Sequence, residues 1–100
     1  MSYQSQIKNV PGKKVKKIML YTLSTCIWCR KTKALLSELN LEYDFLDMDL
    51  LSEEDQEEAY TEMESYNPHL SFPTIVINRG EQVIKGFEEE MIRHLGHKND

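Results

Sequence analysis

The sequence contains little cysteine, because only two of its 100 residues are cysteines, Cys26 and Cys29. Two cysteines are too few for the disulfide framework that stabilises many small secreted domains. Their Cys-x-x-Cys spacing is instead typical of a dithiol that forms and breaks a disulfide, or of part of a metal site. Two incidental thiols are the less favoured interpretation of this spacing. We therefore expect the chemistry of the chain at this pair.

Long apolar runs are also missing from the sequence. No run approaches the roughly 18–20 residues of a membrane-spanning helix, and residues 1–6 lack the basic-then-apolar order of a secretory signal. We therefore expect a cytoplasmic protein that does not contact a membrane. With 40% hydrophobic and 29% charged residues, the chain has room for a single core. It is expected to fold alone, as a monomer.

Acidic residues are absent from the first 37 positions, which carry eight lysines and arginines. Nine carboxylates and no base then lie between Asp47 and Glu64. The net charge of −5 excludes a polybasic protein, so nucleic acid is not an expected partner. Most of these charges are interpreted as solvated surface. The basic part nevertheless contains both cysteines, and a basic surround suits an acidic protein partner.

Glycine and proline are scarce, with four and three residues, and they help to divide the chain. Residues 1–14 contain Pro11-Gly12 and no periodic apolar pattern. We expect them to form a flexible N-terminal arm that is dispensable for folding. Residues 15–100 are predicted to form the folded domain.

The folded domain is predicted to be α/β, in the order β-α-β-α-β-β-α. Strands are expected at residues 15–23, 43–48, 73–78 and 82–85, and helices at residues 26–40, 53–66 and from 88 onward. Ala34, Leu35 and Leu39 are predicted to face the core from the first helix, and Ser52 to cap the second. Strands joined through helices should pair parallel and the final hairpin antiparallel. The result is a four-stranded mixed sheet with helices on both faces.

The two cysteines are predicted to have different tasks because of their places on the first helix. If Thr25 or Cys26 opens that helix, the two sulfurs lie on one face, close enough to form a disulfide. Unpaired backbone N–H groups at the helix start, with Arg30 and Lys31 nearby, favour a thiolate at Cys26. Cys29 lies one turn deeper. We therefore expect Cys26 to attack a disulfide and Cys29 to resolve the product.

The chain resembles the glutaredoxins, small members of the thioredoxin superfamily. The resemblance rests on Cys26-Ile27-Trp28-Cys29 after an apolar strand, on Ser71-Phe72-Pro73-Thr74 before the third strand, and on Gly86-Phe87-Glu88 before the last helix. It implies that residues 15–100 form a glutaredoxin-like domain with a thioredoxin-like fold. The function it implies is reduction of protein disulfides by a thiol-disulfide oxidoreductase, with Cys26 and Cys29 as catalytic residues.

The same resemblance assigns the substrate-binding residues. It implies that Pro73 is a cis-proline lying against the cysteines and that the Phe72 backbone pairs with a bound peptide or with glutathione. It also implies that Gly86, Phe87 and Glu88 receive a carboxylate. Trp28 has two interpretations, a partly buried ring that fills space beside the second strand or an exposed surface on which partners dock.

The sequence differs from the glutathione-using members of that family at three places. Leu23 stands where they usually have a lysine, Ile27-Trp28 where proline-tyrosine is common, and Phe87 where a cysteine or serine is usual. Loss of the lysine removes a charge-assisted contact to a glutathione carboxylate. No bound cofactor is expected. The electron source is therefore either glutathione or a thioredoxin reductase system.

A metal or iron–sulfur module that uses the Cys-x-x-Cys pair is the alternative from a different functional class. A four-ligand zinc site needs two more donors, and the close pair His94 and His97 has only two residues between its members. A cluster shared by two chains through Cys26 would fit better. An intact dithiol with a poor glutathione site argues against it, so no metal ligands are assigned.

Overall fold

The structure is a computed structural model that describes residues 3–96. Its helices, short 3₁₀ helices (η) and strands follow the order η1 (Tyr3–Gln6), β1 (Lys8–Val10), β2 (Ile18–Thr22), α1 (Ile27–Glu38), β3 (Tyr43–Asp47), η2 (Met48–Leu50), α2 (Glu53–Tyr66), β4 (Thr74–Ile77), η3 (Asn78–Gly80), β5 (Gln82–Lys85) and α3 (Glu89–His94). No helix in this range is long and apolar enough to cross a membrane.

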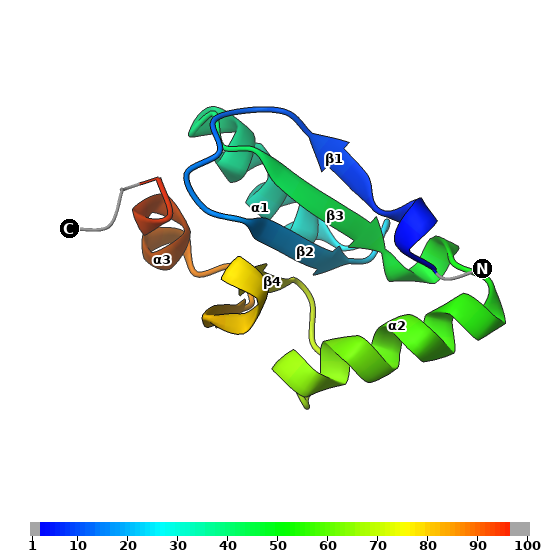
Figure 1. Cartoon of the computed structure of the whole chain (residues 1–100). Helices are drawn as coiled ribbons and strands as arrows, with labels where there is room; N and C mark the ends of the chain where they lie inside the picture. Colours follow the sequence, from blue (N-terminus) through cyan, green and yellow to red (C-terminus); the bar gives the residue numbers. More distant parts are fainter. Residues whose placement is uncertain (1–2, 97–100) are drawn as a thin grey trace.

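The strands form one mixed sheet in the order β1-β3-β2-β4-β5. β2 and β3 run parallel, and every other neighbouring pair is antiparallel. In Figure 1, α1 lies behind this sheet and α2 runs below it in the view, and the two helices pack on opposite faces. The predicted mixed sheet with helices on both faces is confirmed.

Each face of the sheet has its own hydrophobic core. On one face, Leu20 and Ile75 of the sheet pack with α1 and α3 through residues such as Leu36 and Ile92. On the other face, Tyr21 and Val76 pack with α2 and with the N-terminal segment. Successive residues of a strand point to opposite faces, so β2 and β4 contribute side chains to both cores. Their sequences are therefore almost continuously apolar.

The first correction concerns the N-terminal arm and the number of strands. Residues 3–10 were expected to be irregular, but they form η1 and β1, and β1 pairs antiparallel with β3. The sheet therefore has five strands rather than four. A strand of three residues is too short to show a period-2 pattern, so β1 could not be predicted from the sequence.

The second correction concerns the strand that follows α2. β2 and β3 are joined through α1 and pair parallel, as predicted, but β4 does not pair with β3. It pairs antiparallel with β2 at the register Tyr21↔Thr74. The segment after α2 thus enters β4 at the carboxyl end of β2. Two strands joined through a helix run parallel only when the connection returns the chain to the end of the sheet where the first strand began. The connection through α2 does not do this, so β4 runs antiparallel to β2.

The third correction concerns the buried face of α1. Leu35 is buried as predicted, but Ala34 is exposed and Leu39 only half-buried, while Cys29 and Thr32 are buried in their place. Thr32 is compatible with burial because its hydroxyl donates a hydrogen bond to the Trp28 carbonyl at 2.8 Å. The apolar pattern of the sequence did not predict that Cys29 and Thr32 belong to the core.

The predicted start of α2 is confirmed. Ser52 is the N-cap, and its hydroxyl accepts a hydrogen bond from the Asp55 N–H at 3.2 Å. Three acidic residues in the first turn complement the positive end of the helix dipole. The helix ends at Tyr66, just before Asn67-Pro68, as predicted.

Candidate active site

Cys26 is the N-cap residue of α1, which confirms the predicted helix start. Its backbone is extended, with φ −84° and ψ 117°, and its sulfur accepts a hydrogen bond from the Cys29 N–H at 3.2 Å. The Cys26 N–H donates to the Leu23 carbonyl at 3.1 Å, which fixes the turn that enters the helix. The sulfur therefore occupies the position where side chains usually satisfy the free N–H groups of a helix.

The two thiols differ in exposure. Cys26 is half-buried, whereas Cys29 is 0% exposed, and both are free thiols. Burial, followed by its hydrogen bond with Cys26, raises the pKa of the Cys29 thiol to about 12. A reagent in solution therefore meets Cys26, while Cys29 keeps its proton and stays covered.

A polar network that sequence reasoning missed lies at the ends of β2 and β3, next to the dithiol. The buried Thr22 hydroxyl donates to the Asp47 carboxylate at 2.7 Å, and Lys33 Nζ lies 3.5 Å from the same oxygen. Lys33 follows Cys29 by one helical turn, and its charge opposes the rise in the Cys29 pKa. The alternation of β3 around Asp47 was the one sequence signal, since it places a carboxylate at a strand end.

Asp49 fixes the loop that precedes Cys26. Its carboxylate accepts hydrogen bonds from the N–H and the hydroxyl of Ser24. These two bonds hold the pKa of Asp49 below its usual range. The segment after β3 thus anchors the loop between β2 and α1, a contact that no sequence pattern predicted.

Pro73 lies at the same end of the sheet, and the Phe72–Pro73 peptide bond is cis, as the resemblance implied. Because Tyr21 pairs with Thr74, the antiparallel register places Pro73 beside the end of β2, where the loop to the cysteines begins. The Pro73 carbonyl accepts a hydrogen bond from the Gly86 N–H at 2.8 Å. Within residues 3–96, no hydrogen bond engages the backbone of Phe72.

Asn67, the residue after α2, shapes the loop that leads to Pro73. It is 0% exposed, and its amide donates to the hydroxyls of Ser71 and Thr74 at 3.0 and 2.9 Å. Its oxygen accepts the His69 N–H at 3.1 Å. An asparagine directly before a proline is a turn signal, but its burial depends on tertiary packing.

Trp28 is exposed, which disagrees with its interpretation as a partly buried ring that fills space beside the second strand. Its side chain is 51% exposed, and its ring stacks on Phe87 with centroids 5.6 Å apart. Lys31 Nζ lies 5.0 Å from the Trp28 ring centroid, and Ile27 beside it is 60% exposed. The stack joins α1 to the segment before α3. Trp28 and Phe87, two of the predicted binding residues, are thereby in contact.

Two further predicted binding residues, Gly86 and Glu88, flank Phe87 in the chain. Gly86 precedes Phe87 and has φ +86°, a conformation that favours glycine. Its N–H donates to Pro73, and the Glu88 N–H donates to the Gly86 carbonyl at 3.2 Å. Glu88 is the N-cap of α3 and is exposed, with no hydrogen bond from its side chain to that helix.

Two of the three histidines lie in the described range. His69 is exposed, His94 closes α3, and His97 falls outside the described residues. No group of three or more histidine, cysteine, aspartate or glutamate side chains in the described range is arranged to hold a metal ion. The arrangement at the dithiol is one half-buried sulfur, one fully buried sulfur a turn behind it, and an apolar rim with Lys31 over the Trp28 ring.

The chain is similar in sequence and structure to several known proteins. The model of the glutaredoxin family matches residues 18–83. The crystal structure of the glutaredoxin from Methanosarcina mazei Go1 is 43% identical, with a TM-score of 0.82 over 92% of this chain and 89% of that one. Methanoredoxin from Methanosarcina acetivorans is also 43% identical, with a TM-score of 0.79 over 84% and 87%. An uncharacterized glutaredoxin-like 8.6 kDa protein of the rubredoxin operon of Clostridium pasteurianum is 35% identical over 78% of this chain and 95% of its own length.

Proposed function

The chain belongs to the glutaredoxin family, with its thioredoxin-like fold and a Cys-x-x-Cys redox pair, and we propose on this premise that it reduces protein disulfides through Cys26 and Cys29. The observation that carries the proposal is the unequal exposure of the two sulfurs, half-buried at the helix start and fully buried one turn later. We further propose that a thioredoxin reductase system, rather than glutathione, returns the pair to its dithiol form. Such a protein works where thiols are kept reduced, in agreement with the expected cytoplasmic location.

The first step is attack on the substrate. The Cys26 thiolate forms a bond to one sulfur of the substrate disulfide, the substrate S–S bond breaks, and the released sulfur takes up a proton. The Cys29 N–H donates a hydrogen bond of 3.2 Å to the Cys26 sulfur, which holds that sulfur at the start of α1 for the attack. The product is a mixed disulfide between Cys26 and the substrate.

The second step releases the substrate. Cys29 loses its proton and attacks the Cys26 sulfur, the mixed disulfide breaks, and the second substrate sulfur leaves as a thiol. The chain is oxidised to the Cys26–Cys29 disulfide and the substrate is reduced by two electrons. The positive charge of Lys33 opposes the high pKa of Cys29, which assists this deprotonation. A two-electron reductant then restores both thiols.

The surface around Cys26 supports a protein substrate. Ile27 and Trp28 are exposed apolar side chains beside the sulfur, and Lys31 lies over the Trp28 ring. The unengaged backbone N–H and C=O of Phe72 offer an extended segment two hydrogen-bonding groups. We propose that the substrate presents an apolar residue near its disulfide and acidic residues on its flank.

The carboxylate site of glutathione-using relatives is weak in this chain, which supports the choice of reductant. Leu23 supplies no cation, and Phe87 supplies neither a hydroxyl nor a thiol. Two of the three backbone N–H groups from Gly86 to Glu88 already donate within the chain. Because a hydrogen bond to a charged group contributes about 1.5–3 kcal/mol, the missing contacts would weaken glutathione binding by one or two orders of magnitude.

The test measures reduction of a protein disulfide by the purified chain with each recharging system in turn. One arm supplies glutathione and glutathione reductase, and the other supplies thioredoxin reductase and its nicotinamide. We expect turnover mainly in the second arm. The Leu23→Lys variant should raise glutathione-driven turnover by about tenfold because it adds one charge-assisted contact. Dominant turnover with glutathione in the parent would overturn the choice of reductant.

A separate arm tests the oxidoreductase proposal itself. The Cys29→Ser variant should accumulate a mixed disulfide on Cys26 when mixed with the substrate, whereas the Cys26→Ser variant should form none on Cys29. Mass spectrometry distinguishes the two adducts. Equal adduct formation by both variants would contradict the division of labour between the cysteines and favour a metal-binding role for the pair.

A further inference from the structure

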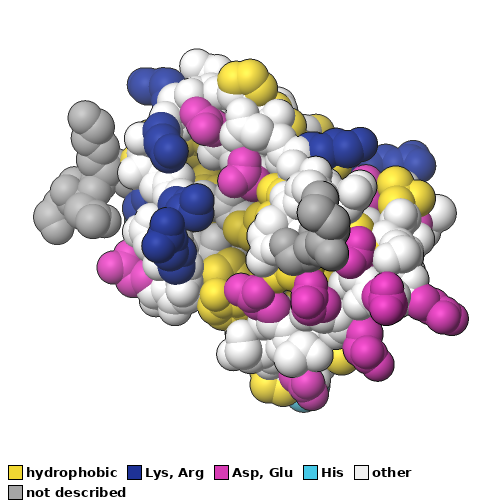
Figure 2. Space-filling model, turned by 45° about the vertical axis from the view of Figure 1, so that its right-hand side comes forward, with side chains coloured by type: hydrophobic (Ala, Val, Ile, Leu, Met, Phe, Trp, Pro, Cys, Tyr) yellow, Lys and Arg dark blue, Asp and Glu magenta, His cyan; other side chains and the backbone are white. Residues whose placement is uncertain are grey.

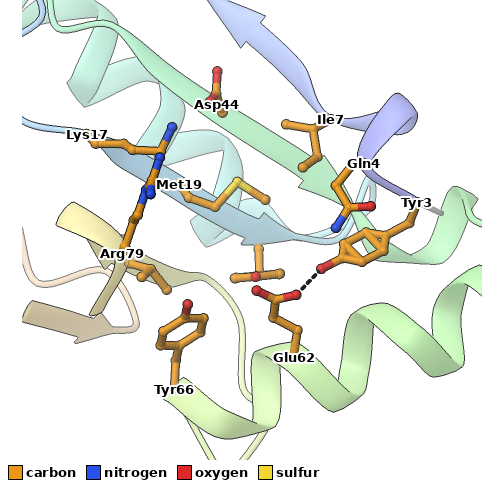
Figure 3. Close-up of a pocket in the computed structure, with 11 residues that line it drawn as sticks. Tyr3, Gln4, Ile7, Lys17, Met19, Asp44, Glu62, Tyr66 and Arg79 are labelled. Atoms are coloured by element: carbon orange, nitrogen blue, oxygen red, sulfur yellow. Dashed lines mark hydrogen bonds between the residues drawn. The ribbon is translucent and has the colours of Figure 1, made fainter. Parts of the chain in front are cut away.

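A cavity of about 180 Å³ lies on the face of the sheet opposite α1, away from the dithiol site. Figure 3 shows it between η1, the sheet and α2, with Met19 near its middle. It is lined by side chains from five parts of the chain, namely Tyr3, Gln4, Ile7, Lys17, Met19, Tyr21, Asp44, Glu62, Tyr66, Val76 and Arg79. Met19 and Val76 are neighbours in the β2/β4 register and form an apolar floor.

One end of the cavity carries two cations. Asn78 brings their segments together, because its oxygen accepts the Lys17 N–H at 3.0 Å and its N–H donates to the Lys17 carbonyl at 2.8 Å. Lys17 and Arg79 then extend along the same end of the hollow (Figure 3). In residues 3–96, no carboxylate lies within ion-pair distance of either cation. Asp44 also lines this end, but its oxygen accepts the Asn9 amide at 2.8 Å.

Arg79 occupies a backbone position that disfavours its own side chain. It lies in the hairpin between β4 and β5 with φ 61° and ψ 28°, the left-handed region that favours glycine or asparagine. A glycine there would suit the turn better, as Gly80 does next to it. Arg79 thus places a charged side chain along the cavity from a backbone conformation that disfavours it, which suggests a use for its charge.

The other end of the cavity is made of phenols and a carboxylate. The Tyr3 hydroxyl donates to Glu62, and Tyr21 and Tyr66 lie with ring centroids 6.5 Å apart. Burial first, and then the nearby Glu62 carboxylate, raise the pKa of Tyr3 and Tyr21, so these phenols stay neutral at physiological pH. Glu62 has a further oxygen that can accept a hydrogen bond.

We propose that this cavity binds a small aromatic carboxylate that carries a hydrogen-bond donor at its far end. The carboxylate would pair with Lys17 and Arg79, the ring would lie on Met19 and Val76, and the donor would reach Glu62. The volume is below the about 300–1,000 Å³ of pockets for drug-sized ligands, which limits the occupant to about one ring. An anion there also relieves the repulsion between the two cations.

The test uses 4-hydroxyphenylacetate as the probe and the neutral 4-hydroxyphenylacetamide as its isosteric control. Binding is followed by NMR of methyl-labelled methionine in the full chain, because Met19 lines the cavity and the exposed Met91 on α3 does not. We expect a saturable shift of the Met19 methyl signal with the acid, no shift at Met91, and binding of the amide at least about tenfold weaker.

Three variants of the chain identify the charges involved. Lys17→Gln and Arg79→Gln should each weaken binding of the acid about tenfold. Arg79→Gly should lose binding to the same extent and keep or increase thermal stability, because glycine suits the left-handed turn. Lys13→Gln, at an exposed lysine outside the cavity, should bind like the parent. Equal binding of acid and amide, an unmoved Met19 signal, or parental affinity in both charge variants would overturn the proposal.

Discussion

At the scale of single residues, the two cysteines differ in burial although they are only one helical turn apart. Cys26 is the N-cap of α1 and is half-buried, while Cys29 is fully buried and its raised pKa is opposed by the charge of Lys33. The Cys-x-x-Cys spacing alone predicted the order of their tasks. It could not predict the polar network, because Asp47 reaches the site from a different strand.

This difference predicts the selectivity of alkylation in the reduced protein. At pH 7.5 a thiol whose pKa is about 12 is ionised in fewer than about one molecule in ten thousand, and Cys29 is also 0% exposed. Iodoacetamide should therefore label Cys26 at least about a hundredfold faster than Cys29. Peptide mapping by mass spectrometry after timed quenching measures the two rates. Comparable rates would contradict the burial of Cys29.

Cys29 also predicts a pH dependence of stability. Its pKa in the folded chain is about 12, above the ordinary value of 9.0, so folding favours the neutral thiol. The contribution to the free energy of unfolding is present below pH 9 and is lost as the pH rises toward 12. Because one pKa unit corresponds to about 1.4 kcal/mol, the loss amounts to about 4 kcal/mol.

Denaturant unfolding of the reduced protein between pH 8 and pH 11 checks this expectation. Tyr3 and Tyr21 have raised pKa values and destabilise the fold in the same direction, so the comparison is with Cys29→Ser, which retains both tyrosines. The parent should lose more stability than this variant across the range. Parallel curves for the two proteins would contradict the buried neutral thiol.

At the scale of helices and strands, prediction succeeded where the signal was local. Ser52 followed by three acidic residues identified the start of α2, and the β-branched run from Thr74 identified β4. The strand with which β4 pairs could not be predicted in this way, because the pairing depends on where the segment after Asn67 crosses the sheet. The side chains that hold that segment become visible only in three dimensions.

Asn67 is expected to matter for both stability and activity, because it holds the loop that presents Pro73. Asn67→Ala leaves the His69 N–H without its acceptor and removes two hydrogen bonds to hydroxyls. We expect a loss of about 1–3 kcal/mol in the free energy of unfolding and slower disulfide reduction. The control is Asn9→Ala, at an exposed asparagine, which should change stability by less than about 0.5 kcal/mol. Equal effects of the two substitutions would contradict this role of Asn67.

At the scale of the whole molecule, the two faces of the sheet have different characters. The α1 face carries the dithiol, its basic residues and the exposed Trp28. The other face carries α2, whose side chains include seven acids and no base. Figure 2 shows acidic side chains gathered along the lower right, the region where α2 lies in Figure 1. The acidic run was visible in the sequence from the start, but its place on α2, across the sheet from α1, required the fold.

The N-terminal segment belongs to the second face, and this was the least predictable part of the molecule. Tyr3 is 3% exposed in the core beside α2, although the polar residues around it show no apolar period. The burial of one ring in a polar segment cannot be predicted from neighbouring residues, because the helix that covers it, α2, lies about sixty residues away in the sequence.

Burial of this ring predicts that the segment stabilises the fold. Tyr3→Ala leaves a cavity between the sheet and α2 and should lower the free energy of unfolding by about 3 kcal/mol. Tyr3→Phe removes only the hydroxyl that donates to Glu62, so its cost should be about 0.5–1.5 kcal/mol. Ser5→Ala, at an exposed neighbour, should have no measurable effect. Urea unfolding of the four proteins ranks them, and a Tyr3→Ala midpoint equal to that of the parent would mean that residues 3–10 do not pack on the domain. The free energy of unfolding should fall from the parent to Tyr3→Phe and further to Tyr3→Ala, because packing of the ring contributes more than its hydrogen bond. A flexible arm that does not contact the domain would not produce this order.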